Sequence, residues 1–263
     1  AQFKFPDSFI KWMAVWHQLV DYRGLEGIGR MLKKYKLIPY FGDYTTLWNR
    51  IHKIKPEIII PENKEVELAS DGTGLKTSNA GEYRQFKYGD PNAKGKKYLV
   101  VIITADVKKK KLLNLEIHIQ GEGQSEPKVA EKQIKEASEK YKIKKFYGDS
   151  AYDTNNMFDI LQSVGAEAAI KIRKNAAPEN IRGSKRRRKE ARVYKRLGYR
   201  KWAVYKKYGM RWVGTEGIFS AVKRKYGENT VSRSKESLIA EGYQRFWAYD
   251  TIKCYAESKG GVI

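Results

Sequence analysis

Apolar side chains along the first 62 residues recur at the three- and four-residue intervals of amphipathic helices, in three successive segments. Asp43 precedes the third segment and has the side chain of a helix N-cap. We therefore predict a small helical domain over residues 1–62, with Pro56 and Pro61 near its end. Its second and third helices could form a helix-turn-helix that binds DNA, and three-helix scaffolding is the alternative. The polar face of the third helix carries Thr45, Thr46, Asn49, Arg50 and Lys53.

The apolar spacing changes to a two-residue alternation at residues 65–71, which is typical of a half-buried strand. Three further segments of strand composition follow, at residues 83–88, 97–105 and 112–120. Short turns separate the later ones. Consecutive strands joined in this way predict an antiparallel meander, because short turns connect antiparallel neighbours.

Helix and strand patterns then alternate. An amphipathic helix is predicted over residues 127–141, followed by an aromatic-rich buried strand that ends at Gly148. A second helix follows with Asp153 or Thr154 as its N-cap, and a strand is predicted at residues 166–172. Three of the four strand segments, followed by a helix, a strand, a helix and a strand, form the element order of an RNase H-like core. We therefore predict an α/β domain over residues 63–263, with a mixed five-stranded sheet flanked by helices.

Two carboxylates follow predicted strands of this sheet. Asp71 ends the first strand beside Gly72 and Gly74, which let the backbone approach a ligand closely. Asp149 follows the fourth strand, at the edge where open α/β sheets bind ligands. An aspartate at such a junction is otherwise a cap or turn residue, so neither acid alone establishes a site. In an RNase H-like order the first and fourth strands are neighbours, and the two carboxylates would face each other.

A third candidate acid lies on a helix predicted over residues 212–227. Glu216 and Lys223 lie two turns apart, on the polar border of its apolar stripe. An ordinary exposed helix acid is the alternative for Glu216, and only the two aspartates elsewhere favour a functional role. A last helical segment, residues 232–258, is predicted to cover the core.

Basic residues far outnumber acidic ones, with 53 Lys and Arg against 30 Asp and Glu and a formal net charge of +23. This excess predicts a polyanionic partner, and nucleic acid is the commonest one. Residues 171–207 alone hold 16 basic and 2 acidic side chains. We treat residues 173–207 as a basic connector, either a solvated loop or a phosphate-binding segment. Its centre carries Arg182, Lys185, Arg186, Arg187, Arg188 and Lys189.

The remaining composition narrows the protein class. The single Cys254 excludes an internal disulfide framework and suits a reducing compartment. The longest apolar run, residues 99–105, is too short to cross a bilayer, and the first residues lack a signal-peptide core. His17, His52 and His118 are not spaced as metal ligands. We expect a cytoplasmic, DNA-associated protein with no membrane partner.

Together these residues resemble the DDE transposases of bacterial and archaeal insertion sequences. The matching pieces are Asp71-Gly-Thr-Gly on the first strand, Tyr147-Gly-Asp-Ser-Ala-Tyr-Asp around the fourth, and a helical Tyr-Arg-Glu-Lys signature around Glu216. The resemblance spans roughly residues 25–252, including the helical N-terminal part.

The spacing of the signature departs from the family pattern at one point. Two residues separate Tyr208 from Arg211, and six separate Glu216 from Lys223, as in the family. Four residues instead of three separate Arg211 from Glu216, and Trp212 stands where the pattern expects the arginine. The departure affects the assignment of Tyr208 and Arg211, and leaves that of Glu216 and Lys223 intact.

The resemblance implies metal-dependent DNA strand cleavage and strand transfer. Breaking a phosphodiester needs charge neutralised on the attacking and leaving oxygens, and two divalent ions roughly 3.5–4 Å apart supply this. Carboxylate ligands without histidines suit Mg²⁺, with Mn²⁺ as a substitute. By resemblance, the metal ligands and catalytic residues would be Asp71, Asp149 and Glu216. The terminal phosphate would be bound by Lys223, Arg211 and Tyr208.

The implied partners are insertion-sequence ends and target DNA, with a homodimer on paired ends in the nucleoid of a prokaryotic cell. Two alternatives use the same residues differently. An RNase H-like DNA nuclease would cleave without strand transfer, and a transposase-derived DNA-binding protein would do neither. Joined products distinguish the first, and loss of cleavage in a Glu216→Gln variant distinguishes the second.

Overall fold

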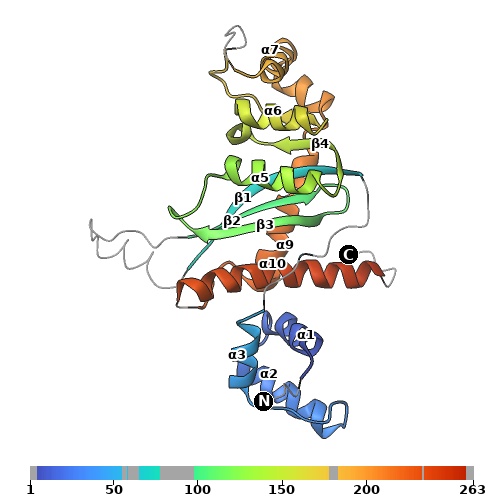
Figure 1. Cartoon of the computed structure of the whole chain (residues 1–263), viewed down its shortest axis with the longest axis vertical. Helices are drawn as coiled ribbons and strands as arrows, with labels where there is room; N and C mark the ends of the chain where they lie inside the picture. The colour runs from blue at the N-terminus through green and yellow to red at the C-terminus, as the bar shows by residue number, and fades with distance from the viewer. Residues whose placement is uncertain are drawn as a thin grey trace, which may run out of the picture.

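The computed structural model describes residues 5–54, 58, 65–77, 98–177, 183–232 and 234–258 (Figure 1). A mixed β-sheet lies at its centre, with helices packed on both faces and a group of N-terminal helices beneath the longest helix (Figure 1). The strand expected at residues 83–88, both prolines of the expected domain boundary and Arg182 lie outside the described residues.

The sheet has five strands in the order β3-β2-β1-β4-β5. The pairs β1–β2 and β2–β3 are antiparallel, whereas β1–β4 and β4–β5 are parallel. This order confirms the predicted RNase H-like sheet, in which the first and fourth strands are neighbours. The strands are β1 (Glu65–Leu75), β2 (Leu99–Asp106), β3 (Lys111–Ile119), β4 (Lys142–Gly148) and β5 (Glu167–Ile170).

Helices cover the two faces of the sheet because successive side chains of a strand point to opposite faces. Val66 and Leu68 of β1 pack in one hydrophobic cluster with residues of α5 and α6. Ala69 packs on the other face, where Met210 of α8 lies against it. The helices α9 and α10 cover β2 and β3 on that second face. The bounds are α5 (Glu126–Ser138), α6 (Asn155–Ser163), α8 (Met210–Gly214), α9 (Glu216–Tyr226) and α10 (Lys235–Ser258).

Of the three N-terminal helices, α1 packs against α10, and the three helices pack against one another. The group lies beneath α10 in Figure 1. The side chain of Asp43 accepts a hydrogen bond from the Thr46 backbone N–H at 2.8 Å, so the predicted cap is formed. Gln244 of α10 donates to the Ile51 carbonyl at 3.1 Å and joins the helices to the sheet domain. Their apolar residues belong to the same hydrophobic cluster as β2, β3 and α10. The helices are α1 (Asp7–His17), α2 (Tyr22–Lys34) and α3 (Tyr44–Ile51).

Most of the basic connector is helical and not a loop, and its binding to phosphate stays a prediction. Helix α7 spans Lys185–Tyr205, and Ser184 caps it by accepting from the Arg187 backbone N–H at 3.3 Å. Lys and Arg are good helix formers, and the buried Ala191 and Trp202 pack the helix against its neighbours. Gly198, at φ 69°, kinks it.

The prediction of a single helix at residues 212–227 is wrong, because the chain forms two helices, α8 and α9, with a break at Thr215. Gly214 is pressed against Val107 in the turn after β2, where a Cβ on Gly214 would lie 2.6 Å from the Val107 Cγ1 atom. The apolar stripe of α9 is buried as predicted, and it consists of Ile218, Phe219, Val222 and Tyr226.

Candidate active site

Asp71 lies on β1, and Asp149 follows directly after β4, the neighbouring parallel strand. Ala69 pairs with Tyr147, so the same register continued by two residues brings Asp71 beside Asp149. Strand β4 ends at Gly148, whereas β1 continues to Leu75. The chain turns away from β4 there, which opens the crevice that α/β sheets use for ligands.

Asp149 also caps a short helix. It precedes the 3₁₀ helix η1 (Ser150–Tyr152), and its Oδ1 atom accepts from the Ala151 backbone N–H at 2.7 Å. The turn role considered from the sequence is therefore real, and it fixes the carboxylate at the end of β4. A cap held in this way presents its side chain in one orientation.

Asp71 accepts hydrogen bonds from the second face of the sheet. Its Oδ2 atom accepts from Arg211 Nη1 at 2.7 Å and from Thr215 Oγ1 at 3.3 Å, while Oδ1 accepts from the Gly72 backbone N–H at 3.0 Å. Burial raises the pKa of Asp71, the Arg211 guanidinium opposes this, and the negative charge of Asp149 adds to it. The two carboxylates are therefore close enough to repel each other.

Glu126 is a further acid beside this pair, and the sequence analysis did not single it out. It is the first residue of α5 and comes from the face opposite α8. Burial raises the pKa of Glu126, and the charges of Asp71 and Asp149 raise it further. An acid before Pro127 in a first helical turn has an ordinary explanation in the helix dipole, so the sequence carried no signal of its position.

Glu216 and Lys223 lie on α9, and the N-terminal end of this helix is next to Asp71. The contact to Asp71 is made by Thr215, the residue before Glu216. The Glu216 side chain is exposed, and none of the hydrogen bonds or ion pairs of the described residues joins it to Asp71 or Asp149. Lys223 is half-buried two turns further along. The roles of both remain predictions.

The signature residues Tyr208 and Arg211 contact the ends of β4 and β1. The buried Tyr208 hydroxyl donates to the Gly148 carbonyl at 3.2 Å. The Arg211 guanidinium lies over the rings of Tyr208 and Trp212, 5.8 and 5.5 Å from their centroids, and reaches Asp71 from there. Despite the shifted spacing in the sequence, Arg211 is thus a neighbour of the carboxylate pair.

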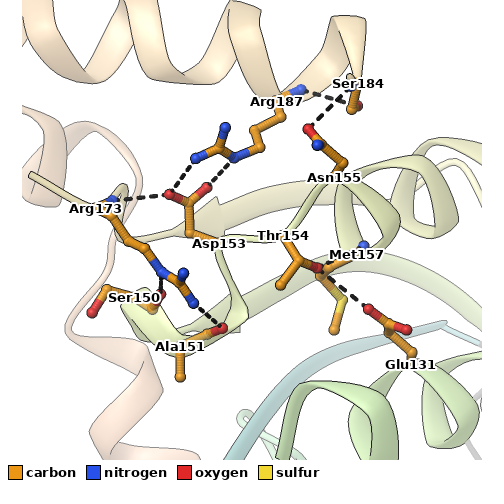
Figure 2. A network of polar contacts seen from close by, with 10 residues as sticks. All are labelled: Glu131, Ser150, Ala151, Asp153, Thr154, Asn155, Met157, Arg173, Ser184 and Arg187. Carbon is orange, nitrogen blue, oxygen red and sulfur yellow. Dashed lines mark hydrogen bonds and ion pairs between the residues drawn. The ribbon is translucent and has the colours of Figure 1, made fainter. Parts of the chain in front are cut away.

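Figure 2 shows the contacts that hold the loop after Asp149. Asp153 accepts from Arg187 through both oxygens, at 2.7 Å from Nε and 2.9 Å from Nη2, and from the Arg173 backbone N–H at 3.0 Å. The Arg173 side chain donates to the carbonyls of Ser150 and Ala151 (Figure 2). This network ties the basic helix α7 to η1. Arg187 is therefore engaged within the protein, and its predicted contact with DNA stays a prediction.

The other residues predicted to bind DNA lie apart from the acids. Lys185 and Lys189 are exposed on α7, and Arg186 and Arg188 are half-buried there. On α3, Thr45 donates to Asp43 at 2.7 Å, and Arg50 pairs with Asp7 at 2.6 Å. Both contacts lie within the N-terminal helices, whose role in DNA binding stays a prediction.

The donor set around Asp71 fits a divalent cation chemically. Within the described residues, no group of three His, Cys, Asp or Glu side chains is already arranged to hold a metal ion. Two carboxylates repel each other at separations longer than a metal–oxygen bond. The acids would therefore have to move closer together to share a metal ion. Carboxylate oxygens suit Mg²⁺ and Mn²⁺. Two buried atoms nearby, Arg211 Nε and the Tyr152 hydroxyl, have no hydrogen-bond partner in the described part of the chain.

In the described ranges, no helix is long and apolar enough to cross a membrane.

Comparison with known proteins points to one family. Residues 62–250, well over half of the chain, match the family described as Transposase DDE domain. Similar solved structures include a piggyBac transposase synaptic complex with hairpin DNA, at 11% identity and a TM-score of 0.46, covering 100% of this chain and 70% of that one. Another is a pre-cleavage Mos1 transpososome, at 10% identity and a TM-score of 0.27, covering 100% and 81%. No curated protein matches the chain.

Proposed function

The chain belongs to the DDE transposase family, and from this premise we propose that it cleaves and transfers DNA strands with divalent metal ions bound at Asp71 and Asp149. The observation that supports the proposal is the register of β1 and β4, which sets these two acids level at the crevice of the sheet. Glu216 would complete the site from the start of α9. The proposed substrates are the ends of an insertion sequence and a target DNA.

Each residue around the acids has a separate task in this proposal. Bound Mg²⁺ or Mn²⁺ would activate the attacking oxygen and stabilise the leaving one. Tyr208 holds the end of β4 through the Gly148 carbonyl, which keeps Asp149 in register with Asp71. Arg211 reduces the negative charge at Asp71, and its Nε, which has no partner among the described residues, would donate to a phosphate oxygen. Lys223 would bind the terminal phosphate.

The basic helix α7 would follow the DNA backbone. Its exposed Lys185 and Lys189 carry charges that a phosphate could neutralise. The Asp153–Arg187 pair connects this helix to the loop after Asp149, so DNA bound along α7 would lie next to the carboxylates. Two copies of the chain would act on a pair of DNA ends, and mass photometry of the DNA complex measures that number.

An Asp149→Asn variant tests the proposal. Wild-type protein incubated with end-bearing DNA, Mg²⁺ and a target plasmid should yield joined products, and the variant should yield neither nicks nor joints. Asp159→Asn is the matched control, because Asp159 is an exposed acid on α6 and the substitution changes charge in the same way. Nicks without joined products from the wild type would favour the RNase H-like nuclease. Cleavage that persists in Asp149→Asn would overturn the assignment of that acid.

A further inference from the structure

We propose that Glu126 is an additional ligand of the divalent metal ion bound at Asp71 and Asp149, so that carboxylates approach the ion from both faces of the sheet. The inference rests on the proposed function, because it concerns the same metal site. It differs from the family signature, since Glu126 precedes the fourth strand and lies on α5 rather than on α9.

The first argument is the contact between Glu126 and β1. A Cβ atom built on Gly72 would overlap the Glu126 carboxylate, at 2.6 Å from its Cδ atom. The carboxylate therefore packs directly on the backbone of the residue that follows Asp71. Only glycine leaves room for it there, and a strand interior otherwise loses stability by containing glycine. The position of Gly72 is explained if this close approach is needed.

The second argument is the Tyr152 hydroxyl. Tyr152 ends η1, three residues after Asp149, and its side chain is fully buried. Its hydroxyl has no hydrogen-bond partner among the described residues. Burial raises the pKa of Tyr152, and the negative charges of Glu126, Asp71 and Asp149 raise it further. The hydroxyl could donate a hydrogen bond to a carboxylate or a water molecule whose other lone pair binds the metal ion.

The third argument concerns what surrounds Asp71 on the other face. There its Oδ2 atom accepts hydrogen bonds from Arg211 and Thr215. Neither side chain is a carboxylate that could share a metal ion with Asp71. Glu216 stands next to Thr215 but is exposed. The acid that packs against β1 beside Asp71 comes from α5. An acid that only stabilised the start of a helix would not need to be half-buried against a strand.

Metal binding without DNA tests the inference, with Mn²⁺ as the probe and electron paramagnetic resonance as the readout. Glu126→Gln should weaken Mn²⁺ binding about tenfold or more, as loss of a supporting group at a metal site does. The matched control is Glu139→Gln, which removes an exposed acid at the other end of α5 and should bind Mn²⁺ like the wild type. Unchanged Mn²⁺ affinity in Glu126→Gln would overturn the inference.

A second variant guards against misfolding of the first. Gly72→Ala keeps every acid but displaces the Glu126 carboxylate, and it should weaken Mn²⁺ binding in the same direction. Asp149→Asn separates the two proposals. If it abolishes Mn²⁺ binding and strand cleavage while Glu126→Gln and Gly72→Ala retain wild-type affinity, the inference fails and the proposed function stands. If Asp149→Asn also binds Mn²⁺ and cleaves DNA like the wild type, the proposed function fails with it.

Discussion

Replacing Arg187 by methionine should destabilise the protein strongly, because it leaves a buried carboxylate without its cation. The Asp153 side chain is 0% exposed and that of Arg187 is 21% exposed. Two parallel hydrogen bonds of 2.7 and 2.9 Å join the groups. Removing one partner of a buried ion pair typically costs about 3–5 kcal/mol. The partial exposure of Arg187 admits some water, so we expect about 3 kcal/mol.

A double-mutant cycle separates the pair from its surroundings. Asp153→Asn, Arg187→Met and the double variant would be unfolded in urea at neutral pH and followed by circular dichroism. Asparagine keeps an acceptor for the Arg173 backbone N–H, so the double variant removes both charges and leaves that hydrogen bond possible. Its loss in the free energy of unfolding should be smaller than the sum of the two single losses by about 1 kcal/mol or more.

Arg186→Met is the matched control for this cycle. Arg186 is the preceding residue on α7 and contacts Glu190 only at 3.9 Å, with 32% of its side chain exposed. Exposed pairs contribute about 0–1 kcal/mol, so this variant should lose less than about 1 kcal/mol. If Arg187→Met were no more destabilising than Arg186→Met, or if the two single effects simply added, the Asp153–Arg187 contact would not be the anchor of the η1 loop.

Three other outcomes follow from the site. Because burial raises the pKa of Glu126 above its ordinary 4.5, the stability of the protein should fall as pH rises from that value through the folded-state pKa, and then level off. Thermal melts of Glu126→Gln should lack this decline. A decline identical to that of the wild type would contradict the burial of the Glu126 carboxylate. Tyr152→Phe removes a buried hydroxyl without a partner among the described residues, so its free energy of unfolding should equal or exceed that of the wild type, and a loss above about 1 kcal/mol would reveal a partner. Changing Lys185 and Lys189 together to alanine should reduce the slope of the logarithm of the DNA association constant against the logarithm of salt concentration, by about 0.9 per lost phosphate contact. An unchanged slope would show that DNA does not contact these two lysines of α7.

Local patterns were sufficient to predict most elements of the fold. The helical spacing of α9 depends on which side chains are apolar, and its burial follows the same pattern. The two-residue alternation of β1 holds only over residues 65–68, because Leu68, Ala69 and Ser70 are all buried. The N-cap Asp43 was predicted from the sequence, and Thr154 was one of two candidates with Asp153. The structure has Thr154 as the cap, because Asp153 pairs with Arg187. Helix α7 was harder to predict, because its many basic side chains hide the few buried residues that pack it.

The sequence by itself determined most of the order of strands and helices, and with it the positions of Asp71 on the first strand and Asp149 directly after the fourth. It did so because backbone hydrogen bonding and side-chain alternation are local. The expected end of the first strand at Asp71 was wrong, because β1 continues to Leu75. Only the tertiary structure decided that Glu126 packs on Gly72 and that Arg187 pairs with Asp153. Those contacts join residues far apart along the chain, so they exist only once the helices have packed on the sheet and excluded water around the charges.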